Sequence, residues 1–196
     1  MEKSNFLKQV IIISQSMMNS DKKFHDFVHT KNVYFNIKTL LKYEEADETI
    51  LLTAALLHDI RRECNNHGTE GSLCAREILK SIEGISEEFI GKVCEIIYSH
   101  DKRGFQDTCD KRVFYDADKM DAFSDFGLIR SFMMYALENL TIKESCNRYI
   151  EYIDSTYNSL FFNISKELIH KDYLKNRDKA LEMLMNYYKI DLIYEY

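Results

Sequence analysis

The chain has 196 residues, a length that suits one domain with its own hydrophobic core. Hydrophobic residues make up 45% and charged residues 30%, which excludes an intrinsically disordered chain. The formal net charge of −6 excludes the basic surface of a free-standing nucleic-acid binder, so we expect no nucleic-acid polymer as a partner. A local basic pocket for a small phosphate ester is compatible with this charge.

The pattern of proline and glycine predicts helices. The chain has no proline and only six glycines, whereas sheet-rich folds need more turn residues. Apolar residues recur at helical spacing, which predicts eight or nine helices joined by short polar loops. Their expected ranges are about 5–19, 24–42, 48–60, 69–81, 86–100, 111–121, 126–138, 142–162 and 165–188. The run 50–57 is apolar on every side, so the helix containing it is expected to be central and buried.

The cysteines and the N-terminal residues indicate the compartment. No two of the five cysteines form a CxxC pair, which excludes a zinc ribbon. The apolar run at residues 10–14 is too short for the hydrophobic region of a signal peptide or for a membrane span. We therefore expect a cytoplasmic protein with reduced thiols and no membrane association.

The most informative pair for chemistry is His58-Asp59, which ends the helix that is apolar on every side. Burying ionisable side chains there costs free energy unless they have a partner, and a metal ion is such a partner. Neighbouring helical residues point about 100° apart, yet both can converge on one ion at a helix end, where the backbone opens. The alternative is a surface pair just beyond the helix.

Two further groups have the spacing of metal ligands. His25 and His29 lie four residues apart on one helical face, and we favour His29 as the ligand, with His25 at the helix start. Asp118 and Asp121 also share a face, while Asp116 points elsewhere; a solvated acidic face is the alternative. Clustered histidine and aspartate suit hard or borderline ions such as Mn, Fe, Mg, Zn or Ni.

The order of these residues resembles the H…HD…D pattern of the HD superfamily of metal-dependent phosphohydrolases. HDFVHTKNV is similar to the family's first helix, LLTAALLHDIRR to its central helix and FYDADKMDAFSDFGLIRSF to its closing aspartate helix. HGTEGSLCAREIL and VCEIIYSHDKRG are similar to the two helices between them. The resemblance covers about residues 21–135 and implies one all-α HD domain over residues 1–196, with a helical extension at about 140–190.

The resemblance implies a catalytic metal site. The ligands of one divalent ion would be His29, His58, Asp59 and Asp118. Mn, Fe, Mg, Co, Ni and Zn are the candidate ions, and the remaining positions around the ion would take water or substrate oxygens. The implied activity is hydrolysis of a small phosphate ester or anhydride, expected to be a nucleotide, by attack of metal-activated water on phosphorus.

Other residues have roles that the resemblance leaves open. His67 and His100 would hold a second ion bridged by Asp59, support the ligands, or donate a proton to the leaving oxygen. Glu63 is a candidate base that orients water, and Asp121 a candidate to orient a histidine or lysine. The candidate phosphate contacts are Arg61, Arg62, Lys102, Arg103 and Lys119. Among them we favour Arg61 and Lys119, because they neighbour ligands.

Departures from the family's pattern narrow the range of expected activities. Without proline the chain cannot contain the GYP element of the cyclic-dinucleotide phosphodiesterases, and it lacks the insertions and partner domain of the alarmone synthetase-hydrolases. The alternatives are a dinuclear-iron HD-type oxygenase and a non-catalytic, metal-binding regulatory HD domain. Because several basic residues can hold a polyphosphate tail, nucleoside triphosphates are favoured over monophosphates. A homodimer is left open.

Overall fold

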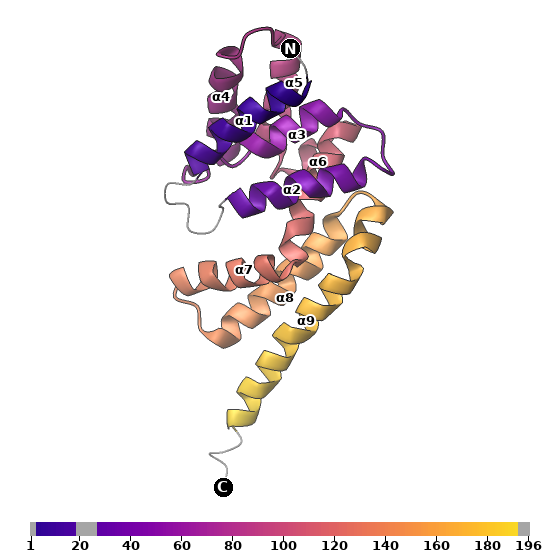
Figure 1. Ribbon diagram of the computed structural model, residues 1–196. Coiled ribbons are helices and arrows are strands. Elements are labelled where there is room, and N and C mark those ends of the chain that lie inside the picture. The colour runs from indigo at the N-terminus through magenta and orange to yellow at the C-terminus, as the bar shows by residue number, and fades with distance from the viewer. Residues whose placement is uncertain (1–2, 19–26, 192–196) are drawn as a thin grey trace. The chain divides into compact units, whose positions relative to one another are not determined.

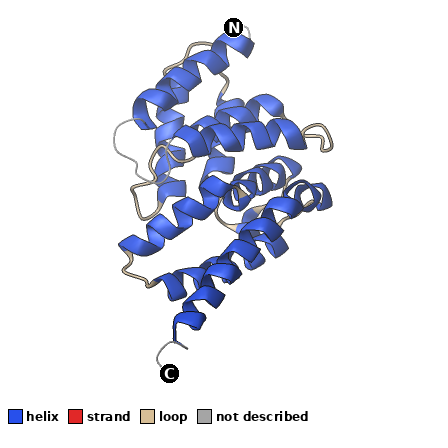
Figure 2. Cartoon of the chain, turned by 60° about the horizontal axis from the view of Figure 1, so that its bottom comes forward, coloured by secondary structure: helices blue, strands red, loops and turns tan. Residues whose placement is uncertain are grey.

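The computed structural model describes residues 3–18 and 27–191, and within these ranges all regular secondary structure is helical, joined by loops and without a strand (Figure 2). The prediction of an all-α fold is therefore confirmed. The described α-helices are α1 (Lys3–Met18), α2 (Phe27–Leu40), α3 (Glu48–Leu57), α4 (His67–Lys80), α5 (Glu87–Ser99), α6 (Cys109–Met120), α7 (Asp125–Leu137), α8 (Ile142–Ser159) and α9 (Asn163–Asp191). Two 3-10 turns, η1 (Arg103–Phe105) and η2 (Asp121–Phe123), flank α6.

The chain divides into two compact units, residues 1–118 and 119–196. In the first unit α3 contacts α1, α2 and α5, and every residue from Ile50 to Leu57 is buried (Figure 1). The prediction that this helix is central is therefore confirmed. It remains a prediction that residues 1–196 form one domain.

Local side-chain chemistry explains where the helices around the site begin and end. Asp47 caps α3 by accepting hydrogen bonds from the backbone N–H groups of residues 49 and 50, and Ser86 caps α5 by accepting one from residue 89. Helix α3 ends at Leu57, three residues before the predicted end. The chain continues through tight turns, in which the Arg62 N–H donates to the Asp59 carbonyl at 3.1 Å. The HD pair thus lies at an open helix end.

Helix α4 packs closely because it presents two glycines. A Cβ atom at Gly71 would lie 3.0 Å from the carbonyl oxygen of His58, and one at Gly68 would lie 3.0 Å from that of Tyr98. Only glycine allows the backbones to come this close without a shift. The first turns of α4 therefore lie directly against the ends of α3 and α5, and these ends carry His58 and His100.

The second unit consists of η2, α7, α8 and α9, with α8 and α9 packed along each other. Asp154 on α8 accepts hydrogen bonds from Arg177 and Tyr173 of α9, with distances of 2.9 Å and 2.8 Å at Oδ1. A capping box between Thr141 and Glu144 begins α8. None of the described helices has the combination of length and apolar composition needed to cross a bilayer.

Candidate metal centre

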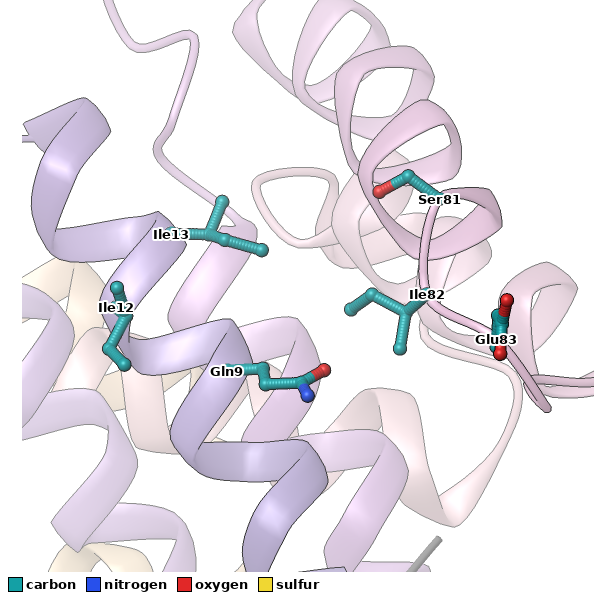
Figure 3. A pocket seen from close by; sticks show the side chains of 6 residues that line it. All are labelled: Gln9, Ile12, Ile13, Ser81, Ile82 and Glu83. Carbon is teal, nitrogen blue, oxygen red and sulfur yellow. The ribbon is translucent and has the colours of Figure 1, made fainter.

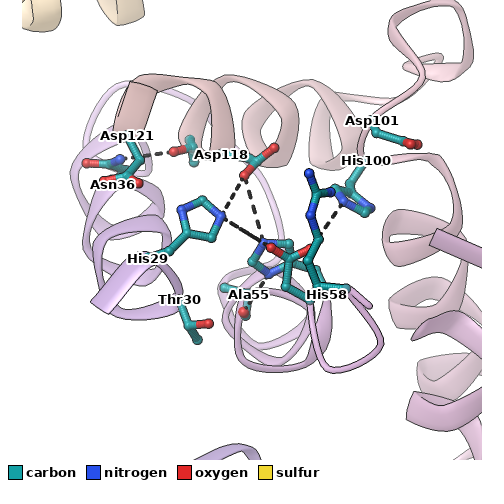
Figure 4. Close-up of polar contacts among 12 residues, drawn as sticks. His29, Thr30, Asn36, Ala55, His58, His100, Asp101, Asp118 and Asp121 are labelled. Carbon is teal, nitrogen blue, oxygen red and sulfur yellow. Dashed lines mark hydrogen bonds and ion pairs between the residues drawn. The ribbon is translucent and has the colours of Figure 1, made fainter. Parts of the chain in front are cut away.

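Four side chains, from α2, α6 and the turn after α3, converge in the first unit, and Figure 4 labels three of them, His29, His58 and Asp118. The Nε2 atom of His29, on α2, lies 3.2 Å from Nε2 of His58, 3.7 Å from Oδ2 of Asp59 and 3.2 Å from Oδ1 of Asp118, on α6. The Nε2 atom of His58 lies 3.6 Å from the same oxygen of Asp59 and 3.8 Å from the same oxygen of Asp118. The two imidazole nitrogens therefore lie next to each other, and each faces an oxygen of both carboxylates.

The spacing of these atoms fits a single metal ion. Ligands at about 2.1 Å from an ion are about 3.0 Å apart at a right angle and about 3.4 Å apart at a tetrahedral angle. The five distances that involve a histidine, 3.2–3.8 Å, lie slightly above these values, and ligand atoms of His29, His58 and Asp59 all lie within 4.8 Å of one another. Two nitrogen and two oxygen donors suit a borderline or hard divalent ion. The residues present therefore form a histidine–aspartate cluster that can hold a divalent metal.

Burial controls the protonation of His58. The four side chains are between 1% and 9% exposed. Desolvation lowers the pKa of His58, and this effect outweighs the carboxylates of Asp59 and Asp118, which favour the charged imidazolium. A neutral imidazole has a lone pair for coordination, so His58 is in the form that binds metal.

A backbone hydrogen bond orients the rings at both helix ends. His58 Nδ1 lies 2.9 Å from the carbonyl oxygen of Ala55, and His100 Nδ1 lies 2.6 Å from that of Ile97, each three residues back along the helix. With the proton on Nδ1, each ring turns its Nε2 lone pair away from its own helix. Since His58 and His100 follow the last residues of α3 and α5, the same local geometry operates twice.

A second group adjoins the first through Asp59. Ligand atoms of Asp59, His67 and His100 lie within 4.8 Å of one another, and Asp59 Oδ1 is 3.9 Å from His100 Nε2. Arg62 lies against this group, with its guanidinium nitrogen 2.6 Å from His67 Nε2. Desolvation, followed by the charge of Arg62, lowers the pKa of His67, so its ring is neutral and accepts this hydrogen bond.

The remaining candidates from the sequence have diverse surroundings. Arg61 pairs with Glu63 at 3.3 Å, and both are largely exposed. Lys102 donates to the carbonyl oxygen of Tyr98 and lies 3.8 Å from the centre of its ring. Arg103 is exposed on η1.

Two candidates, Lys119 and Asp121, belong to the second unit. Arg130 donates to Asp121 at 2.7 Å, so an arginine that the sequence analysis did not consider contacts this carboxylate. The alternative ligand His25 lies outside the described residues.

Asn36 is a residue of the site that sequence reasoning missed. Its side-chain amide donates to the carbonyl oxygen of Ala117 at 2.9 Å, which ties α2 to α6 immediately before Asp118. Asn36 lies seven residues after His29, two helical turns along the same face. That spacing was visible in the sequence and could have identified Asn36.

A surface hollow of about 650 Å³ lies elsewhere in the first unit, between α1 and the turn after α4 (Figure 3). It is lined by Gln9, Ile12, Ile13, Ser81, Ile82 and Glu83. It contains neither a candidate metal ligand nor a basic side chain. We therefore do not assign it to a phosphorylated substrate.

Comparisons with known proteins bear on this cluster. Residues 26–122 match the model of the HD domain family, and this range contains all four converging residues. Searching curated proteins gives no significant match. An HD-superfamily hydrolase from Bacillus thuringiensis has a similar crystal structure, with 19% identity, a TM-score of 0.76 and coverage of 95% of this chain and 98% of that chain.

Two further crystal structures share the fold. The Lin1889 protein from Listeria innocua has 21% identity and a TM-score of 0.77, with coverage of 93% of this chain and 96% of that chain. YpgQ from Bacillus subtilis, in complex with ADP, has 20% identity and a TM-score of 0.67, with coverage of 94% and 97%. The family match shows that the chain carries an HD domain at residues 26–122, and the crystal structures show that the chain shares their fold.

Proposed function

We propose that this protein is a metal-dependent phosphohydrolase that acts on nucleotides. The observation that carries the proposal is the convergence of His29, His58, Asp59 and Asp118, whose ligand atoms lie 3.2–3.8 Å apart in the pairs measured. A bound divalent ion supplies acidified water and polarises a phosphoryl oxygen. The chain's own residues hold the ion, orient the donors through backbone hydrogen bonds and leave the remaining ion positions to water or substrate.

Charged side chains near the ligands support a phosphorylated substrate. Arg61 and Arg62 lie on the turn that follows the HD pair, and Lys102 and Arg103 lie two and three residues after His100 in the chain. Guanidinium and ammonium groups stabilise the negative charge that builds on phosphoryl oxygens during transfer. We propose Arg61 as a phosphate contact: its guanidinium pairs with Glu63 at the surface and donates to Cys64 Sγ at 3.7 Å, and an incoming anion can compete with such weak surface contacts. Lys119 remains a proposed contact on the basis of its place next to Asp118.

Nucleotides are the proposed substrate class, with triphosphates favoured over monophosphates. YpgQ, which shares the fold, was crystallised in complex with ADP. Several basic residues follow the ligands in sequence, so a polyphosphate tail can engage more of them than a monoester can. Cleavage at the α-phosphorus would then release pyrophosphate and a monophosphate.

The proposal includes one tightly held ion. A second ion could take His67 and His100 as ligands together with Asp59, which the two groups of candidate ligands share. However, the Arg62 guanidinium already donates to His67 Nε2 at 2.6 Å, so a second ion would have to displace a cation. Under this proposal His67 and His100 act on the leaving group or orient the ligands. A dinuclear-iron oxygenase requires both histidines as ligands and is the alternative that metal analysis would reveal.

The test is a hydrolysis panel. Metal-free protein receives Mn, Co, Mg or Ni with nucleoside mono-, di- and triphosphates and simple phosphate esters, and the products are identified by phosphorus NMR. The Asp118→Asn variant, which loses a proposed ligand and is purified in the same way, shows how much hydrolysis comes from contaminating phosphatases. Pyrophosphate with a monophosphate supports the proposal, whereas orthophosphate from monophosphates with triphosphates untouched refutes the favoured substrate. Bound metal without any turnover would favour a regulatory domain instead.

A further inference from the structure

Helix α7 of the second unit carries apolar side chains on two opposite faces. Its inner face packs within the unit: the ring of Phe132 lies 5.8 Å from that of Tyr149, and Tyr135 is buried. The outer face is exposed, with fractions of 62%, 58%, 47% and 65% at Phe126, Ile129, Met133 and Leu137. We refer to these four side chains as the α7 stripe.

The α7 stripe has the spacing of a helix-packing seam. Its members follow one another at intervals of three, four and four residues, which keeps them within about 80° of the helix circumference. Such alternation of three and four residues places side chains as knobs against a facing helix. The stripe extends for about 17 Å, three turns of the helix. A surface helix that is apolar on both faces therefore offers a second helix a place to pack.

We propose that the α7 stripe binds the α7 stripe of a second copy of this chain, in antiparallel orientation, to form a dimer. This inference does not rest on the proposed function. The stripe is close to symmetric about its midpoint, near residue 131. An antiparallel two-fold arrangement places Phe126 opposite Leu137 of the other copy and Ile129 opposite Met133. A self-complementary patch of this kind closes into a two-fold dimer and adds no further copies.

The exposed area sets the expected affinity of the dimer. With about 200 Å² for each fully exposed side chain of this size, the stripe exposes roughly 450 Å². Two copies bury roughly 900 Å² through the stripes alone, whereas a specific interface buries at least about 1,200 Å². The edges of the two helices supply the remainder, including Ala136, which is also exposed. We expect a weak dimer, because the stripes alone bury less area than an ordinary specific interface does.

The charges at the ends of the stripe permit the antiparallel arrangement. Asp125, at the start of α7, pairs with Lys175 and Lys179 at 2.8 Å and 3.0 Å. Glu138, just beyond the end, pairs with Arg148. Antiparallel packing brings these two ends together, but each carboxylate is already balanced by cations of its own unit. The helix dipoles are also opposed in this orientation, which is favourable.

The experiment measures the mass of the full chain by light scattering and sedimentation from about 1 µM to about 500 µM, a range that brackets micromolar affinity. Over this range the measured mass of the wild-type protein should rise from that of one chain to that of two chains. Met133→Glu should weaken dimerisation at least tenfold, because it places two carboxylates in the apolar seam. Leu73→Glu is the matched control, since Leu73 is an exposed leucine on α4 that is outside the stripe. It should dimerise like the wild type, and all variants should retain their helical content.

Orientation is tested by cross-linking. Phe126→Cys and Leu137→Cys should form a disulfide efficiently when mixed and poorly when each is oxidised alone, with wild type as the background from native cysteines. Ile129→Gln replaces Met133→Glu if the latter loses helical signal. A wild-type chain that stays monomeric throughout overturns the proposal. So does a dimer that both stripe variants leave intact, or a Phe126→Cys cross-link as strong alone as in the mixture.

Discussion

Replacing Asp59 by asparagine tests the metal centre directly. Two of the four converging groups are carboxylates, so a divalent ion bound among them is electrically balanced. Asp59→Asn preserves shape but leaves one net positive charge in a site whose side chains are at most 9% exposed. An uncompensated buried charge costs about 3–5 kcal/mol. Metal affinity should therefore fall by about two to three and a half powers of ten.

The loss of metal affinity is also measurable as a smaller gain in thermal stability when metal is added. With free metal at about 1,000 times the dissociation constant, wild-type protein gains about 4 kcal/mol from binding. For a chain of this length that corresponds to a rise in Tm of about 8–16 °C. A variant whose metal affinity is about a thousandfold lower gains only about 0.4 kcal/mol of stability from the same metal concentration, which is a rise in Tm of about 1–2 °C. Scanning calorimetry with and without metal gives both values.

The control is Asp107→Asn, the same chemical change at a carboxylate that is 73% exposed and pairs with Lys111. Its metal-induced rise in Tm should equal that of the wild type. Metal analysis of the dialysed proteins provides an independent measure of occupancy. An Asp59→Asn variant that keeps the wild-type stoichiometry and the wild-type rise in Tm would refute the assignment of Asp59 as a ligand.

Three further changes probe the surroundings of the ligands. His67→Ala and His100→Ala should each leave the metal content at one ion and lower the rate by about 10–100-fold; a halved metal content would instead reveal a second ion. Arg61→Ala should raise the KM for triphosphates with unchanged metal binding, and an unchanged KM would remove Arg61 from the phosphate site. Gly71→Ala, whose Cβ would lie 3.0 Å from the His58 carbonyl oxygen, should destabilise the protein by about 1–3 kcal/mol, read as a lower Tm in thermal denaturation. A Tm equal to that of the wild type would show that α4 can move away at no cost.

Helix positions were predictable because their determinants are local. Apolar spacing identified each described α-helix, and α3 and α5, which Asp47 and Ser86 cap, begin within one residue of the expected starts. The ends were less predictable. The sequence suggested that α3 continues to residue 60, but the helix ends at Leu57, where the chain turns and both His58 and Asp59 reach the cluster. Local helix propensity does not predict this end, where the carbonyl oxygen of His58 packs closely against Gly71 of α4.

The sequence by itself determined the helical class and, through the order of His29, His58-Asp59 and Asp118, the family pattern. Only the tertiary structure decided that these side chains, up to 89 residues apart in sequence, come together, with each histidine nitrogen 3.2–3.8 Å from the other histidine and from both carboxylates. It also decided that Arg62, rather than Arg61, contacts His67. Contacts of this kind depend on how helices pack against each other and on which rotamers their neighbours permit, and no local pattern carries that information.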